Sequence, residues 1–366
     1  MKYLIFFVLA ILFACSSGDD GRLVKNQSDV SLNPFDSVNT LIKAEPSDAN
    51  LYFQRAKLHY AQRDLPASLA DVGRALKLDS SNADYYLLFA DLKLISKESR
   101  ESRDALITAL RFNPNNIDVL IKLGELYMIV QDSDHSFEYL NRALKLDVYN
   151  GRAYQIKGFN YMYLGDTANA VSSFQTAIEQ DPQDYESYMQ LGFFYANIQD
   201  DLALDYFNNA LKVNPTSLEA LYAKGLFLQT IEKSREAIGA YRAMLDIRES
   251  QTDAWYNQGY VYLEQLAVYD SAAYCFTRAL DFGPAVYPNA VYNRGLAHER
   301  AQDFPKAEAD YRAALEMDPQ YDLAAIGLER ILEWYSEDLL VLIPHLIERL
   351  NGFTISNFSP VQYGSS

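Results

Sequence analysis

The chain is poor in the residues on which most catalytic and metal sites depend. Its 366 residues include two cysteines and four histidines. Two cysteines, Cys15 and Cys275, cannot build a disulfide framework, and no pair of histidines has the spacing of a zinc site. Glycine-rich phosphate loops and nucleophile-elbow patterns are missing as well. The sequence therefore predicts a protein that is not an enzyme and that uses no metal or cofactor.

Basic residues are also scarce relative to acidic ones. The chain has 32 lysines and arginines against 49 aspartates and glutamates, and its formal net charge is −17. No basic stripe is visible, so nucleic acid is disfavoured as a partner. Two interpretations of the acidity remain open: a solvated face that keeps the protein soluble, or attraction of a basic partner.

Long apolar runs are rare, and the first one lies at the beginning of the chain. Met1 and Lys2 precede an apolar stretch over residues 3–14, which is too short to span a bilayer and is typical of a secretory signal. The residues Leu12-Phe13-Ala14-Cys15 resemble the lipoprotein box of bacteria. The resemblance implies cleavage before Cys15 and acylation of that cysteine, which would anchor the protein stably. The alternative is an ordinary secretory signal with an incidental cysteine.

The residues after Cys15 bear on the membrane to which the protein is sorted. Ser16 stands where some lipoproteins have the aspartate that retains them at the inner membrane, so the resemblance implies an outer-membrane lipoprotein. Small residues and the pair Asp19-Asp20 also resemble surface-export signals, and both the periplasmic and the surface face remain open. Residues 15–35 are polar and predict a flexible tether.

Small residues return every 34 positions through most of the chain. The first series is Ala56, Ala90, Gly124, Gly158, Gly192, Gly225, Gly259 and Gly295, with late spacings of 33, 34 and 36. A second series, in step with the first, is Ala75, Ala109, Ala143, Ala177, Ala210, Met244, Ala279 and Ala314. Each unit also contains two stretches with the apolar period of a helix. Such self-similarity predicts stacked helical repeats, in which small residues let two helices approach closely.

The 34-residue unit resembles the tetratricopeptide repeat. The fourth unit, residues 151–184, matches the family pattern at seven places: Tyr154, Gly158, Tyr161, Ala170, Phe174, Ala177 and Pro182. Proline near the end of a unit disfavours helix just before it, and Asp64 and Asp303, each two residues ahead of a proline, predict the start of second helices. The resemblance implies an all-α fold, a right-handed α-solenoid of about eight helix-turn-helix repeats with a C-terminal capping helix.

The pattern divides the chain into six segments. We expect the signal peptide at 1–14, the tether at 15–35, a degenerate N-terminal capping helix at 36–48, eight repeats at 49–321, a capping helix at 322–335, and an apolar segment with a tail at 336–366. The apolar part, 336–353, has three possible roles: it caps the last repeat, plugs the groove or docks on a partner.

In the tetratricopeptide family the first helices line a concave groove, chiefly through positions 2, 5, 9, 12 and 13 of the repeat. Position 9 is polar in the first three units of this chain and apolar in the last five. The resemblance implies that the following residues line the groove: Phe159, Met189, Phe193, Tyr222, Leu226, Tyr256, Tyr260, Tyr292 and Leu296, with Asn257 and Asn293 holding a peptide backbone. The alternative is that the apolar side chains pack between adjacent helices.

The prediction for function is a scaffold or adaptor, lipid-anchored at the bacterial outer membrane. Its groove would bind a peptide or an amphipathic helix of another envelope protein. The alternative is a ligand- or nutrient-binding accessory lipoprotein of a transporter complex.

Overall fold

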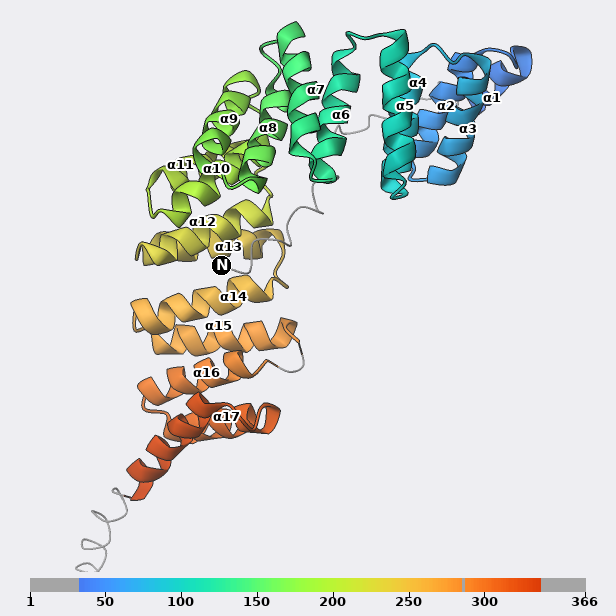
Figure 1. The fold of residues 1–366 in the computed structure, drawn as a ribbon. Helices are drawn as coiled ribbons and strands as arrows, with labels where there is room; N and C mark the ends of the chain where they lie inside the picture. The colour runs from blue at the N-terminus through green and yellow to red at the C-terminus, as the bar shows by residue number, and fades with distance from the viewer. Residues whose placement is uncertain (1–32, 285–286, 337–366) are drawn as a thin grey trace, which may run out of the picture. The chain divides into compact units, whose positions relative to one another are not determined.

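The computed structural model describes residues 33–284 and 287–336, and these are organised as helices joined by short turns. No strand occurs among them. The chain divides into two compact units, residues 1–112 and 113–366. The prediction of an all-α repeat fold is confirmed (Figure 1).

The helices follow one another in pairs. The first unit contains α1 (Pro34–Ala44), α2 (Ala49–Ala61), α3 (Leu65–Leu78), α4 (Ala83–Ile95) and α5 (Ser99–Phe112). The second contains α6 (Ile117–Ile129), α7 (Ser133–Leu146), α8 (Gly151–Tyr163), α9 (Thr167–Gln180), α10 (Tyr185–Asn197), α11 (Leu202–Val213), α12 (Leu218–Thr230), α13 (Ser234–Ile247), α14 (Thr252–Tyr260), the π-helical turn η2 (Val261–Gln265), α15 (Tyr269–Phe282), α16 (Pro288–Arg300) and α17 (Phe304–Met317). Residues 322–336 form one more helix.

Each repeat is one hairpin of two helices, and each hairpin packs on the next. Within the first unit α2 pairs with α3 and α4 with α5, and α3 also packs against α4. The second unit repeats this arrangement from α6 with α7 to α16 with α17, so its core is a series of clusters between neighbouring helices. No hairpin buries its apolar face alone, which is why the stack depends on contacts between neighbours.

The small residues of the first series lie where the two helices of a hairpin touch. A Cβ added to Gly192 would come within 2.5 Å of the Phe207 ring, and one added to Gly158 within 2.6 Å of the Phe174 ring. Repeats 1 and 2 have alanine at this position instead, and there the residue 16 positions later is Val72 or Leu106 rather than an aromatic. Every ring at the second position thus faces a glycine, which leaves room for it, whereas repeat 3 combines Gly124 with the aliphatic Leu140.

The turn inside each hairpin has a left-handed residue at the same repeat position. These residues have φ between 53° and 76°: Arg63, Lys97, Gln131, Gly165, Gln199, Glu232, Ala267 and Gln302. Among these eight, Gly165 is the single glycine, although this conformation costs other residues about 1–2 kcal/mol. Backbone hydrogen bonds hold the turn: the amide of Gln131 donates to the Met128 carbonyl at 3.0 Å, and the amide of Asp132 donates to that of Tyr127 at 2.8 Å.

Helix ends follow the sequence signals. The side chains of Asp64 and Asp303 accept hydrogen bonds from the backbone amides of Ala67 and Lys306, as expected for N-caps before a proline. The second helices α5, α9, α11, α15 and α17 each end two residues before a proline.

The seventh repeat absorbs an extra residue inside its first helix. Gly259 and Phe276 are 17 positions apart, whereas the equivalent Gly158 and Phe174 are 16 apart. The helix accommodates the insertion in η2, where the amide of Leu266 donates to the Val261 carbonyl at 3.1 Å in an i→i+5 pattern. Such π-turns inside α-helices often occur at functional sites.

Candidate functional site

The residues predicted to line a groove lie on the first helices of repeats 4 to 8. These helices are α8, α10, α12, α14 and α16, all in the second unit. Phe159, Tyr222, Leu226, Tyr256, Tyr292, Leu296, Asn257 and Asn293 are half-buried, and Phe193 and Tyr260 are exposed. Phe193 and Tyr260 therefore contribute mainly to the surface, whereas the half-buried residues also pack inside the stack.

Met189 does not line an open surface. Its side chain is 1% exposed and belongs to a core cluster with Phe207 and Phe227. Its repeat position is taken in later repeats by half-buried tyrosines, and the hydroxyls of Tyr222 and Tyr256 accept hydrogen bonds from the next repeat. A thioether has no such polar end, and Met189 is therefore buried against the second helix.

Phenylalanines at position 9 lie edge-on against a buried ring. Phe159 contacts Phe174 at 5.1 Å between ring centroids, and Phe193 contacts Phe207 at 5.7 Å, both in T-shaped arrangements. The Phe193 ring nevertheless remains 40% exposed, and Tyr260 remains 39% exposed. Phe193 thus packs on one side and faces solvent on the other, and Tyr260 is open to solvent to the same extent, as a docking surface requires.

Asn257 and Asn293 connect successive repeats through tyrosines. The Asn293 Nδ2 donates to the Tyr256 hydroxyl at 2.9 Å, and the Asn257 Nδ2 donates to the Tyr222 hydroxyl at 3.4 Å. Each asparagine thus bonds to the position-5 tyrosine of the preceding repeat, which sequence reasoning missed. A role in holding a peptide backbone stays a prediction.

Two further tyrosines contact the position-5 tyrosines of repeats 7 and 8. Tyr287 stacks on Tyr256 at 5.4 Å between centroids, and Tyr321 meets Tyr292 at 5.3 Å. Burial raises the pKa of Tyr287 and the pKa of Tyr321 to about 12. Their phenols therefore stay protonated at neutral pH and remain available as hydrogen-bond donors.

The groove positions of repeats 3 to 5 carry a polar network instead. The Arg152 guanidinium donates to the buried Glu125 carboxylate at 2.6 Å and also to Gln155. Gln155 in turn donates to Asp184, which accepts from Ser187 as well. Burial raises the pKa of Asp184, and the hydrogen bonds from Ser187 and Gln155 oppose that shift. Charged and amide groups thus join these repeats, while asparagine–tyrosine hydrogen bonds and aromatic contacts join the later ones.

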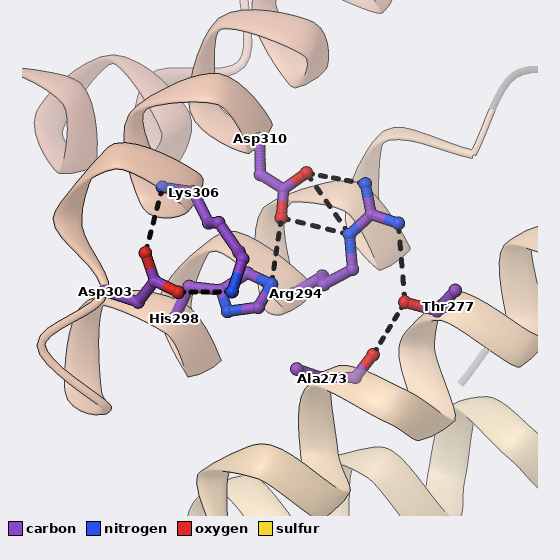
Figure 2. A network of polar contacts seen from close by, with 7 residues as sticks. All are labelled: Ala273, Thr277, Arg294, His298, Asp303, Lys306 and Asp310. Carbon is purple, nitrogen blue, oxygen red and sulfur yellow. Dashed lines mark hydrogen bonds and ion pairs between the residues drawn. The ribbon is translucent and has the colours of Figure 1, made fainter.

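A second constellation recurs in the first and the last repeat. Arg294 on α16 makes a two-pronged contact with Asp310 on α17, with its Nη2 2.6 Å from Oδ1 and its Nε 3.0 Å from Oδ2. The remaining Nη1 donates to the Thr277 hydroxyl on the preceding helix at 3.5 Å (Figure 2). His298 Nε2 lies 3.9 Å from Asp310 in the same group.

The first repeat repeats this arrangement in its own unit. Arg55 donates to both oxygens of Asp71 at 2.6 and 2.7 Å, and its Nη1 donates to Asn39 on the preceding helix at 2.8 Å. His59 Nε2 lies 3.8 Å from Asp71. The arginine is position 7 of the repeat, the histidine position 11 and the aspartate position 23. That recurrence was visible in the sequence and could have identified both clusters, which fix a hairpin to the helix before it.

Neither cluster has the composition of a metal site. The part of the chain that the structure describes contains no group of three or more histidine, cysteine or acidic residues that could hold a metal ion. Cys275 is 2% exposed, and burial raises the pKa of its thiol to about 12, so it is protonated and inert at neutral pH. None of the described helices is both long and apolar enough to cross a bilayer.

Predictions at both ends of the sequence lie outside the described residues. They concern the N-terminal segment up to residue 32, with the signal peptide at 1–14, the lipidation site Cys15 and most of the tether, and the apolar segment from residue 337 onward. The predicted end of the tether at residue 35 is two residues too late, since α1 begins at Pro34.

Comparisons with known proteins agree with the repeat pattern. Two family models described as tetratricopeptide repeat match this chain, one at residues 288–321 and the other at 117–147 and 151–184. A solved structure, the C-terminal part of a repeat-containing protein of this type from Cytophaga hutchinsonii, superposes with a TM-score of 0.57 at 16% identity. It covers 66% of this chain and 98% of that one.

Curated relatives match a smaller part. The general transcriptional corepressor ssn6 of Schizosaccharomyces pombe is 28% identical over 128 residues, and the general transcriptional corepressor trfA of Dictyostelium discoideum is 25% identical over 130 residues. These matches cover 33% and 34% of this chain but span 11% and 9% of the two relatives. The family models and the hairpin architecture together show that the chain carries tetratricopeptide repeats and folds as an α-solenoid of that type.

Proposed function

We propose that this protein is a non-enzymatic scaffold that binds a peptide or amphipathic helix of an envelope partner along the first helices of repeats 4 to 8. Tetratricopeptide repeats in general serve protein–protein interaction, and fold alone does not name a partner. The observation that carries the proposal is the exposure of Phe193 and Tyr260, at 40% and 39%, on the face predicted to form the groove. Large aromatic side chains that stay half open to solvent are typical of binding surfaces.

The charges beside these rings favour a basic partner segment. Position 2 of repeats 5, 6 and 7 is acidic, with Glu186, Glu219 and Asp253. Burial raises the pKa of Glu186, and the neighbouring Glu219 raises it further, so the two carboxylates are close enough to repel each other. A lysine or arginine placed between them would relieve that repulsion. The partner segment would thus carry apolar residues for the rings and basic residues for the carboxylates.

Site-specific photocrosslinking in the native envelope tests the groove. A photoreactive residue at position 193 or 260 should capture the same partner, and Phe193→Ser with Tyr260→Ser should abolish capture from a neighbouring position at an unchanged melting temperature. The matched control is Tyr149→Ser, which removes another exposed aromatic, 73% exposed, from a turn outside the groove. A large fall in melting temperature for the groove variant would show that the rings are core residues, and recovery of sugars or lipids alone would overturn the scaffold.

The same proposal places the protein at the bacterial outer membrane through a lipid on Cys15. Its support is the sequence at the beginning of the chain, with an apolar stretch followed by Leu12-Phe13-Ala14-Cys15. Changing Cys15→Ala should move the protein from the membrane to the soluble fraction and remove label from metabolically incorporated fatty acid. Unchanged fractionation and labelling would contradict the anchor without affecting the groove.

A further inference from the structure

The helix of residues 322–336 packs on α17 with one of its faces. Ala324 is fully buried and Ile331 is 1% exposed, and both belong to a core cluster with Tyr311 of α17. A Cβ added to Gly327 would come within 2.6 Å of the Tyr311 ring. This helix thus packs on the last hairpin as α12 packs on α11 and α14 on α13.

A neighbouring face of the same helix is apolar and open. Leu332 is 45% exposed there, and a depression of about 530 Å³ lies between this face and α17. Leu315 and Leu328 in the depression are half-buried, whereas Glu329 and Glu333 are exposed, so aliphatic side chains lie deeper and carboxylates lie at the rim. The full lining is Leu315, Ala325, Leu328, Glu329, Leu332, Glu333 and Ser336.

The depression lies where the other hairpins hold their second helix. In the 34-residue frame that starts repeat 8 at Pro288, Glu329 is position 8 of a ninth unit. Position 8 of repeat 8 is Gly295, and a Cβ added there would come within 3.1 Å of the Tyr311 ring on the second helix. Within residues 33–284 and 287–336, no second helix covers the corresponding face of the last helix.

The chain does not turn after this helix as it does in the eight repeats. Ser336 stands at position 15, where the hairpins have their left-handed residue, but Ser336 is helical. Glu329 also replaces the small residue that lets a second helix approach closely. A covering segment from this chain therefore has to return from further along the sequence, and the next helix-breaking residue is Pro344.

The sequence that follows has the apolar character that such a depression requires. Residues 339–343 read Leu-Leu-Val-Leu-Ile, and Leu346, Ile347, Leu350 and Phe353 come after Pro344. Apolar side chains left in water cost free energy, so this segment and the open face of the last helix both gain when they cover each other.

The segment is long enough to reach the depression. Leu332 lies 12 positions before Pro344, which is about 18 Å along a continued helix. Residues 345–353 span up to about 30 Å when extended, so they can return as far as Leu332. An attached segment also acts at an effective concentration of about 1 mM, which a second copy does not reach in dilute solution.

Charge likewise favours this segment over a second copy of the chain. In a pair of copies related by twofold symmetry, Glu329 and Glu333 of one rim would face the same glutamates of the other, and like charges repel. Arg349 is the only lysine or arginine in residues 337–366, and it is next to Leu350. It places a positive charge beside the apolar side chains that would enter the depression.

We propose that residues 345–353 of this chain cover the depression and complete the end of the stack. Leu350 and Phe353 contact Leu332 and Leu328, and Arg349 meets the glutamates of the rim. The contact concerns the last helix and does not rest on the proposed groove of repeats 4 to 8.

Photocrosslinking from position 332 of the purified full chain tests the proposal. A diazirine-bearing residue there should react with residues 345–353 of the same molecule, as peptide mass spectrometry would show. The matched control is position 323, another leucine of this helix, which is 52% exposed and does not line the depression. It should react with the segment at least tenfold less.

Mixing isotope-labelled with unlabelled protein separates the possible occupants. Crosslinks between a labelled and an unlabelled peptide would show that a second copy covers the depression and would overturn the proposal. The absence of any crosslink from position 332 to residues 345–353 would overturn it as well, since the face is then open or reserved for another protein.

Serine substitutions locate the contact. Leu350→Ser with Phe353→Ser should abolish the crosslink from position 332 and make amide hydrogen exchange in residues 322–336 at least tenfold faster. The control, Ile355→Ser with Phe358→Ser, changes two apolar residues beyond the segment and should leave both measurements unchanged. Retained far-ultraviolet circular dichroism would show that both variants fold. A crosslink that survives Leu350→Ser with Phe353→Ser would contradict the proposed contact.

Discussion

Repeats 7 and 8 are neighbours with the same hairpin architecture, yet repeat 8 fills the space between its helices and repeat 7 leaves it open. Repeat 8 fills it with the pair Arg294 and Asp310, and repeat 1 does the same with Arg55 and Asp71. Repeat 7 has Gln258 and Cys275 at these positions and leaves a cavity with an unpaired buried acceptor. The difference teaches that position 7 is free to specialise, because the hairpin itself is held by the small residue at position 8.

The largest effect should come from breaking the ion pair of repeat 8, Arg294 with Asp310. Asp310→Ala leaves the Arg294 guanidinium, 26% exposed, without its carboxylate, and removing one member of such a pair costs about 3 kcal/mol. Stacked repeats unfold locally, so hydrogen exchange across α16 and α17 is the suitable measurement. Asp303→Asn, a change of another aspartate in the same hairpin that preserves an N-cap side chain, is the control and should cost far less. Equal losses in the two variants would mean that the ion pair adds nothing beyond capping.

A smaller effect should come from building the arginine–aspartate pair of repeats 1 and 8 into repeat 7. Starting from Arg242→Asn, which copies the Asn39 of repeat 1, Cys275→Asp alone buries an unpaired carboxylate and should destabilise α14 and α15. Adding Gln258→Arg should recover a coupling free energy of about 1–3 kcal/mol in a double-mutant cycle, read by hydrogen exchange.

The grafted pair should also occupy the cavity. A coupling energy near zero would show that the two repeats differ in backbone geometry and not only in side chains. The π-helical turn of repeat 7 would then be the reason.

The sequence was sufficient for the repeats and not for the contacts between them. Glycine at position 8 and a ring at position 24 are 16 positions apart in repeats 4, 6 and 8, so their contact, as between Gly158 and Phe174, could be predicted from the pattern. Met189 was misplaced because periodicity gives the face of a helix but not the depth of a side chain. Asn257 and Asn293 bond to tyrosines 35 and 37 residues away, and which of several hydroxyls an amide reaches depends on how repeats stack. The cavity beside Gln258 could not be predicted from the sequence, since a missing contact leaves no pattern.

The smallest expected effect is a pH dependence of stability in repeat 8, caused by His298 beside the pair of Arg294 and Asp310. Burial lowers the pKa of His298 below its ordinary value near 6.5, and Asp310 and Asp303 oppose that shift while Lys306 and Arg294 favour it. The unfolded chain therefore takes up the proton first as the pH falls. The stability contributed by the neutral imidazole is complete above about pH 6.5 and is lost as the pH falls below that value. Hydrogen bonding by Lys306 lowers the pKa of Asp303, so the loss from that carboxylate comes at more acidic pH.

Unfolding of α16 and α17 should accordingly become easier between pH 7 and pH 5.5 in the native chain. His298→Tyr introduces the residue that repeats 3, 4 and 5 have at this position, and it does not titrate in that interval. The variant should lose the pH dependence of hydrogen-exchange protection in these two helices after correction for intrinsic exchange rates. Repeat 7, which has Tyr262 at position 11, supplies the internal reference and should show no such change in either protein. If the pH dependence persists in His298→Tyr, carboxylates cause it and the histidine does not contribute.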